Sequence, residues 1–154
     1  THEGWIYLAT VIDLFSRKVI GWSTSNRMTT PLVLDAMKIA TQRITKTNTK
    51  VILHSDQGSQ YSSYDYKVFA NTHNIIPSMS RRGNCYDNAV AESFFKTLKK
   101  ELVRKQVFLT REIATSKIFE YIEMFYNSKR RHSYLGYISP NEFEKRYNES
   151  GIKV

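Results

Sequence analysis

The sequence of 154 residues has a single cysteine, three prolines and six glycines, and it contains no long hydrophobic run. One cysteine, Cys85, excludes a disulfide framework and indicates a reducing compartment. Apolar runs such as 51–53 are far shorter than the ~18 residues of a membrane span, and no signal-peptide layout opens the chain, so we expect no membrane partner. Acidic residues are also scarce. Lys and Arg outnumber Asp and Glu by 23 to 14, and the resulting charge of +9 favours a polyanionic partner such as nucleic acid.

What remains is typical of one folded domain spanning residues 1–154. Hydrophobic residues make up 41% of the chain, which supplies a core and excludes wholesale disorder. The β-branched and aromatic residues of 5–12 and 18–23 predict two strands that form a hairpin. Thr29, Thr30 and Pro31 predict the start of a helix. The apolar side chains that follow at helical spacing are Val33, Ala36, Met37, Ala40 and Ile44.

Strands and helices alternate along the rest of the chain. Residues 50–56 predict a buried strand, and Ser62 with Asp65 resembles a capping box that opens a helix. A brief strand at 75–76 is expected to stop at Pro77. Two helices follow, one from residue 87 and a last one from near residue 110. Their predicted buried stripes are Ala91, Phe95, Leu98 and Leu102, and then Ile118, Tyr121, Ile122 and Phe125. This order predicts an α/β domain with a mixed sheet.

Asp56 stands where the predicted strand 50–56 ends and a polar loop begins. The carboxyl ends of strands line the functional crevice of open α/β sheets. A carboxylate on such a rigid strand end suits a metal ligand. An Asp two residues before Gly58 also fits a simple turn. Both interpretations stay open at this point.

Glu92 falls early in the helix predicted from residue 87, and Lys96 and Lys99 follow it on the same face. An exposed Glu–Lys pair worth about 0.3–0.5 kcal/mol is the ordinary interpretation. With a second acid such as Asp56, Glu92 would instead bind a divalent metal while the lysines hold phosphates. Carboxylates suit Mg²⁺ or Mn²⁺. Two such ions can promote phosphodiester cleavage and transfer.

Histidine and cysteine give little support to a competing site. The four histidines show no i, i+4 pairing and have no partner cysteines, which argues against zinc. His54, inside its strand, is interpreted as a packed residue. Cys85, with no adjacent histidine, is interpreted as an inert thiol.

Two basic clusters complete the set of candidates. The first is Arg81 and Arg82, and the second is Lys129, Arg130 and Arg131; both have tyrosines nearby. Basic side chains contact phosphates while aromatic rings stack on unpaired bases. A solvated loop is the plain alternative. Two clusters in the more basic half of the chain favour DNA contact.

Several blocks of the sequence resemble a known family. The block 54–61 is similar to the segment around the second catalytic aspartate of retroviral-integrase-like (DDE) transposases. The block 83–95 is similar to the segment around their catalytic glutamate, and the 35 residues between Asp56 and Glu92 match the family's spacing. Residues 13–17, and the pattern from Tyr126 to Pro140, resemble the bacterial insertion-sequence transposases of the OrfA/OrfB type.

This resemblance implies a ribonuclease-H-like mixed sheet flanked by helices, with Asp56 and Glu92 as catalytic acids that bind two Mg²⁺ or Mn²⁺ ions in the intact site. It implies DNA strand transfer, with insertion-element ends and target DNA as partners. The full-length protein would be a homo-oligomer in the bacterial cytoplasm, at the nucleoid. The rival functions are a ribonuclease-H-like nuclease that only hydrolyses and a non-catalytic DNA-binding remnant.

The family's first catalytic acid lies on the opening, central strand of its sheet, which the resemblance places before Thr1. Asp13 matches a turn position, so we expect a structural role for it. Two carboxylates cannot fix both metals, and we therefore expect residues 1–154 alone to lack strand-transfer activity. The strands 5–12 and 50–56 would lose their shared neighbour. We expect marginal stability or association as a result.

Overall fold

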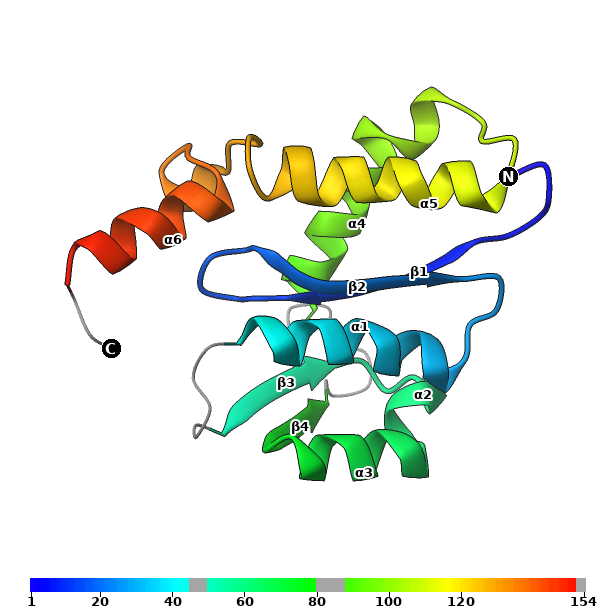
Figure 1. Ribbon diagram of the computed structural model, residues 1–154, viewed down its shortest axis with the longest axis horizontal. Coiled ribbons are helices and arrows are strands. Elements are labelled where there is room, and N and C mark those ends of the chain that lie inside the picture. The colour runs from blue at the N-terminus through cyan, green and yellow to red at the C-terminus, as the bar shows by residue number, and fades with distance from the viewer. Residues whose placement is uncertain (45–49, 80–87, 152–154) are drawn as a thin grey trace.

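The computed structural model describes residues 1–44, 50–79 and 88–151, and it has an α/β fold (Figure 1). No helix within these ranges has the length and apolar character needed to cross a membrane. The elements in chain order are β1 (Tyr7–Ile12), β2 (Val19–Ser25), α1 (Thr30–Arg43), β3 (Val51–Ser55), α2 (Ser59–Ser62), α3 (Tyr64–Thr72), β4 (Ile75–Met79), α4 (Ala89–Glu101), the 3₁₀-helix η1 (Val103–Lys105), α5 (Arg111–Phe119), the π-helix η2 (Glu120–Tyr126), the 3₁₀-helix η3 (Ser133–Leu135) and α6 (Pro140–Glu149).

Strands β1 and β2 form the predicted antiparallel hairpin. Asp13 organises its turn: the carboxylate accepts hydrogen bonds from the Phe15 amide at 3.1 Å and from Ser16 Oγ at 2.8 Å. Arg17 completes the turn with a left-handed φ of 61°. Asp13 therefore has the structural role that the sequence predicts.

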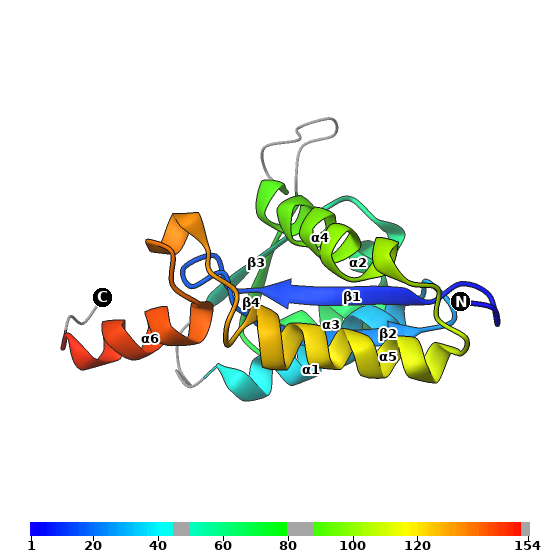
Figure 2. The same ribbon diagram turned by 90° about the horizontal axis from the view of Figure 1, so that it is seen from above.

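Helices cover both faces of this hairpin. On one face lies α1, and α4 and α5 run over the other, on either side of β1 (Figures 1 and 2). Val33, Ala36, Met37 and Ala40 of α1 are buried as predicted. Gly21 of β2 permits the close approach of α1, because a Cβ there would lie 2.2 Å from the Ala36 carbonyl oxygen. The core on the opposite face consists of Val19, Phe94, Leu98, Ile118, Tyr121, Ile122 and Tyr126.

The second sheet pairs β3 with β4 in parallel. The expected stop at Pro77 is wrong, because β4 continues through this residue to Met79. Pro77 lies opposite Leu53, and within the described residues β4 has no further strand beside it. An edge strand tolerates proline because its outward-facing positions need no N–H for the ladder.

The helix predicted from Ser62 begins one residue later, at a different cap. Ser63 is the N-cap of α3, and its Oγ accepts a hydrogen bond from the Tyr66 amide at 3.2 Å. Ser62 instead ends the short helix α2. Ser62 and Ser63 could each cap a helix in the sequence. Because Ser62 is the last residue of α2, Ser63 is the N-cap of α3.

The two sheets are not joined by a ladder. In the described ranges β1 pairs with β2 alone and β3 with β4 alone, so the predicted mixed sheet is two two-stranded sheets. Helix α1 links them, because Val33 and Met37 pack in one cluster with Ala9 of β1 and Leu53 of β3. No strand formed by the described residues lies in a ladder between β1 and β3.

The π-helix η2 changes which side chains face the core. Phe125 was predicted to be buried but is 41% exposed, whereas Tyr126 is 5% exposed. The Asn127 amide donates to the Ile122 carbonyl at 2.9 Å, five residues back. A wider turn rotates the following residues relative to an α-helix, so the α-helical spacing used for the prediction fails here.

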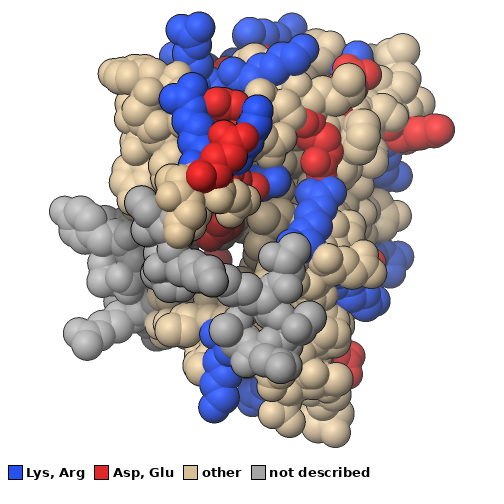
Figure 3. Space-filling model, turned by 60° about the vertical axis from the view of Figure 1, so that its left-hand side comes forward, with Lys and Arg blue, Asp and Glu red and all other residues tan. Residues whose placement is uncertain are grey.

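Acidic side chains are flanked by Lys and Arg over the upper part of the face in Figure 3. Ion pairs of described residues include Lys18 with Glu144 at 2.7 Å and Arg146 with Glu142 at 2.7 Å. Much of the acidic charge is thereby neutralised locally. Further basic residues, among them Lys96 and Lys99, line a cleft beside α4.

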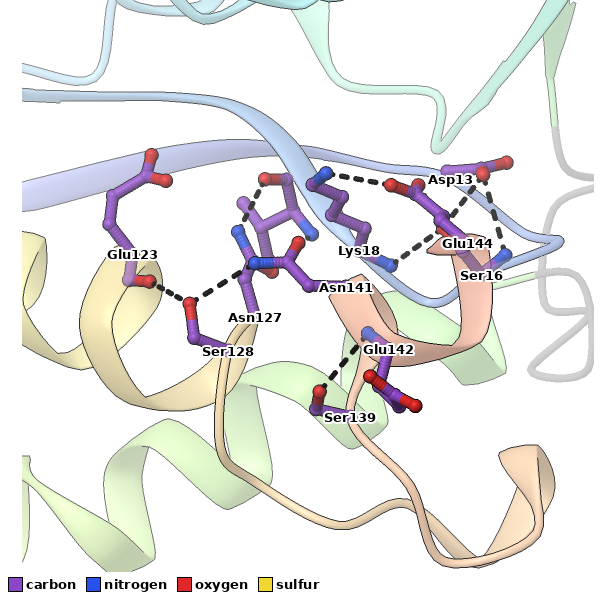
Figure 4. Close-up of polar contacts among 11 residues, drawn as sticks. Asp13, Ser16, Lys18, Glu123, Asn127, Ser128, Ser139, Asn141, Glu142 and Glu144 are labelled. Carbon is purple, nitrogen blue, oxygen red and sulfur yellow. Dashed lines mark hydrogen bonds and ion pairs between the residues drawn. The ribbon is translucent and has the colours of Figure 1, made fainter. Parts of the chain in front are cut away.

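Helix α6 was not predicted, since the helix near Thr110 was expected to be the last. The sequence did carry its signal, because Ser139 and Glu142 have capping-box spacing around Pro140. Its Glu144 Oε1 lies 2.9 Å from Ser16 Oγ, and its Oε2 accepts a hydrogen bond from Lys18 Nζ at 2.7 Å, so α6 is joined to the hairpin turn (Figure 4).

Candidate active site

A cleft of about 820 Å³ opens between the hairpin, the end of β3 and α4. Residues 7–10 of β1 and the first turn of α1 form one wall. His54, Ser55 and Asp56 line it from β3. The wall formed by α4 contributes Glu92, Lys96 and Lys99, followed by Arg104 from η1. The structure thus brings four residues that the sequence singled out into one cleft.

Asp56 directly follows β3, and the turn after it fixes its carboxylate. The Gly58 amide donates to Asp56 Oδ1 at 2.9 Å. A Cβ on Gly58 would lie 2.9 Å from that same oxygen and 2.9 Å from Gln60 Oε1. The two sequence interpretations of Asp56 are therefore compatible, because the turn that it organises holds its side chain in the cleft.

Glu92 occupies the first turn of α4, where the positive end of the helix dipole favours a carboxylate. Its side chain is exposed on the cleft wall. Within the described part of the chain it makes no ion pair with Lys96 or Lys99 within 4.0 Å. The Glu–Lys ion pair of the ordinary interpretation is therefore not formed among the described residues.

Tyr61 was not singled out by the sequence patterns, although it ends the block 54–61. It lines the cleft, with its ring edge-on to Tyr66 at a centroid distance of 5.5 Å. Burial raises the pKa of Tyr61 to about 12, and the nearby Asp56 carboxylate adds to the effect. The Tyr61 side chain is therefore uncharged at neutral pH and forms part of the cleft wall beside the Asp56 loop.

His54 lines the same cleft and contacts the neighbouring strand. Its Nδ1 lies 3.1 Å from Ser78 Oγ, the residue directly opposite in the β3–β4 ladder. This half-buried contact agrees with the packed histidine that the sequence predicts.

The two acids suit a divalent cation. Both offer hard oxygen donors to one cleft, and Mg²⁺ is commonly held by one or two carboxylates together with water and substrate phosphate. The described ranges contain no group of three His, Cys, Asp or Glu side chains that could hold a metal. Any further ligands would have to come from water, from the substrate or from outside these ranges.

The second basic cluster lies apart from the cleft. Lys129 and Arg131 are exposed, but Arg130 is half-buried and its guanidinium lies 3.0 Å from Glu101 Oε1. Burial opposes ionisation of Glu101, yet hydrogen bonds from Arg130 and Tyr121 and the charge of Arg130 hold its pKa below the usual value. Arg130 thus joins the segment after η2 to α4. Arg81 and Arg82 of the first cluster, like Cys85, lie outside the described residues.

Asn127 explains part of the pattern from Tyr126 to Pro140. It is buried, and its Oδ1 accepts from the Val19 amide while its Nδ2 donates to the Val19 carbonyl, each at 3.0 Å. The side chain thus pairs with the start of β2 as a neighbouring strand would. Sequence spacing alone gave no sign of this pairing.

Comparison with known proteins connects these features to a family. The Integrase core domain family matches residues 1–85, and a second Integrase core domain family matches residues 92–147. Transposase InsF for insertion sequence IS3A of Escherichia coli (strain K12) is 51% identical over 95% of this chain and 50% of its own length. The transposase for insertion sequence element IS904 of Lactococcus lactis is 51% identical over 96% of this chain and 58% of its own length. The chain therefore spans about half the length of the curated relatives it matches.

Solved structures agree on the fold. The catalytic core domain of BIV integrase covers 96% of this chain and 90% of its own, with a TM-score of 0.64 and 18% identity. A chain of the simian T-cell lymphotropic virus intasome in complex with PP2A regulatory subunit B56 gamma covers 88% of this chain and 47% of its own, with a TM-score of 0.69 and 14% identity. These likenesses confirm the predicted ribonuclease-H-like architecture. With a family match over more than half of its residues, the chain belongs to the integrase core domain family.

Proposed function

We propose that this chain is the catalytic core of an insertion-sequence DDE transposase. Such an enzyme cleaves phosphodiester bonds at the ends of the element and joins these ends to target DNA. The observation that carries the proposal is the placement of Asp56 and Glu92 in one cleft with Lys96 and Lys99. The family match and the transposases similar to this chain support it.

The acidic and the basic residues of the cleft would have different roles. Asp56 and Glu92 would hold Mg²⁺ or Mn²⁺, with two ions in the intact site, while Lys96 and Lys99 bind phosphates of the strand to be cut. When bound, the metal supplies activation of the attacking hydroxyl and stabilises the leaving oxygen. Gly58 and Tyr61 keep the Asp56 carboxylate directed into the cleft. Fixed charges of this kind stabilise the transition state without reorganising.

The gap between the sheets bears on the domain boundary. A second cavity of about 500 Å³ is lined by Val11 and Ile12 of β1 and by 51–53 of β3, so open space follows both strands along the gap. We propose that a strand from outside residues 1–154 fills this gap and carries a third acid. Residues 1–154 are then the larger part of a catalytic core.

The partners follow from this reaction. Element ends and target DNA are the substrates, and Lys129 and Arg131 are further candidate contacts on the exposed surface. Joining two element ends calls for more than one catalytic core, and we propose that the full-length protein is a homo-oligomer. A bacterial protein with this function would work in the cytoplasm, at the nucleoid.

Replacing Glu92 by Gln in the full-length protein tests the proposal. We expect loss of strand joining by about a thousandfold or more, because the amide is a poor ligand for a hard cation. Binding to labelled element-end DNA should stay within about twofold of wild type. The control is Glu112→Gln, which changes an exposed glutamate in the first turn of α5 and should leave both properties unchanged.

The products of the same assay decide between the rival functions. Joined products that disappear in Glu92→Gln support the transposase. Hydrolysed DNA without joined products would identify a nuclease. Binding of DNA without cleaved or joined products in the wild type would identify a non-catalytic DNA-binding remnant. Joining that survives the substitution would remove Glu92 from the reaction.

A further inference from the structure

Arg104 lines the cleft but lies outside the sequence blocks that resemble the transposase family. It lies in η1, the 3₁₀ turn that begins directly after the C-cap of α4 at Leu102. Helical spacing from Glu92 predicts Lys96 and Lys99 on one face, but it cannot predict Arg104 because the chain leaves the α-helix before reaching it. The turn of η1 places Arg104 on the same cleft wall as the two lysines.

The four charged residues of this wall follow one another along the chain. An α-helix rises about 1.5 Å per residue, so Glu92 and Lys99 are about 10 Å apart along the axis of α4. Successive phosphates of one DNA strand advance about 3.4 Å along a duplex. A strand lying along α4 with its reacting phosphate at Glu92 would therefore pass Lys96 and Lys99 within about three nucleotides. Arg104 comes next.

Among the residues that the structure describes, no carboxylate pairs with the guanidinium of Arg104. Other arginines have partners: Arg43 pairs with Glu123, Arg130 with Glu101 and Arg146 with Glu142. Within the described ranges, Arg104 makes no hydrogen bond or ion pair of this kind, and its side chain is exposed. An arginine fork that faces a cleft without a carboxylate partner can bind both oxygens of a phosphate.

We infer that Arg104 binds a backbone phosphate of the DNA strand whose reacting phosphate lies between Asp56 and Glu92. This inference rests on the proposed function, because it takes DNA as the occupant of the cleft. Arg104 is a positioning residue: it holds the strand at a distance from the acids and sets how far the strand advances along α4. Loss of this contact weakens binding and moves the site of cleavage, while the acids stay intact.

The binding test compares Arg104→Gln with Lys105→Gln in the full-length protein. Lys105 is the matched control, since it is an exposed cation in the same 3₁₀ turn that does not line the cleft. We expect Arg104→Gln to weaken binding of element-end DNA about five- to tenfold at moderate salt. The slope of log affinity against log salt should fall by about one, the value for one lost phosphate contact. Lys105→Gln should change neither quantity.

A second measurement identifies the phosphate. Element-end DNA is prepared with one phosphate at a time replaced by an uncharged methylphosphonate, and each is bound to wild type and to Arg104→Gln. At a single position, the effects of the modified DNA and of the substitution should fail to add, because both remove the same contact. Arg104→Lys should restore part of the affinity.

These outcomes separate the inference from the proposed function. Equal binding by Arg104→Gln and wild type, or an equal loss in Lys105→Gln, would overturn the role of Arg104. Additive effects at every phosphate would do the same. If Glu92→Gln retains joining activity while Arg104→Gln loses binding, the DNA contact stands and the assigned chemistry fails.

Discussion

Gly58 shows how one residue without a side chain can determine the position of a carboxylate that we propose to bind metal. Its amide holds Asp56 Oδ1, and its Cα occupies a place where any Cβ would collide with that oxygen. The φ of Gly58 is −59°, so the requirement is for space and not for a left-handed backbone. The sequence identified Gly58 only as a turn residue.

Substituting Gly58 by Ala should therefore impair the reaction more than the fold. We expect the added methyl to displace the Asp56 carboxylate and lower strand joining about tenfold or more, while the melting temperature changes by only a few degrees. Ser59→Ala, one residue further on, is the control and should retain activity. A full-activity Gly58→Ala protein would show that the Asp56 position tolerates this shift.

Asn127 contributes to stability, because its side chain hydrogen-bonds to the backbone of Val19 in the hairpin. Replacing it by Ala leaves the Val19 amide and carbonyl buried without partners. The free energy of unfolding should fall by about 2–4 kcal/mol, which urea denaturation would measure. Asn141→Ala serves as the control, because the Asn141 side chain is exposed and, among the described residues, donates only to Ser128 Oγ. Equal losses in the two variants would contradict the assigned role.

Between elements, the Glu101–Arg130 pair connects α4 to the chain after η2. The pKa of Glu101 is lowered in the folded protein, so the pair stabilises the fold above the ordinary glutamate pKa of 4.5, and this contribution is lost as pH falls through the folded pKa. We expect unfolding free energy to decrease below about pH 4.5 and Glu101→Gln to weaken that decrease. At pH 7 the variant should lose about 1–2 kcal/mol.

The control for this pair is Glu149→Gln, which affects a glutamate that is 64% exposed and 4.0 Å from Lys145. Pairs of that kind contribute little, so stability should change by less than about 0.5 kcal/mol at any pH. Parallel pH profiles for wild type and Glu101→Gln would remove the pair as a source of acid sensitivity.

Sequence patterns predicted the elements well where the backbone is regular. The hairpin, α1 and the parallel strand β3 follow from hydrophobic spacing and from the Thr29–Pro31 start signal. The patterns failed where local geometry departs from a standard period. The π-turn buried Tyr126 in place of Phe125, and the edge position of β4 admitted Pro77. Strand ends and helical spacing made Asp56, Glu92 and the two lysines candidates, and the family resemblance implied the roles of the two acids. Arg104 needed the irregular turn of η1.

At the scale of the whole molecule, two small sheets share α1 but no ladder. We expect residues 1–154 alone to melt at low temperature or to associate, and to be inactive in joining. A chain extended at its N-terminus with the sequence of its full-length protein should gain at least about 10 °C, since a strand between β1 and β3 would complete both ladders. A cooperative, high-temperature melt of monomeric 1–154 would contradict this expectation.

The two acids of the cleft belong to different halves of the molecule. Asp56 directly follows β3 of the β3–β4 sheet, whereas Glu92 is on α4, which packs against the hairpin. Helix α1 sets the separation of these halves through Val33 and Met37, whose cluster includes residues of both sheets. The distance between the two carboxylates therefore depends on the hydrophobic contacts that α1 makes with both sheets. We expect a smaller side chain at Met37 to change the affinity of the proposed metal site without altering any charged group.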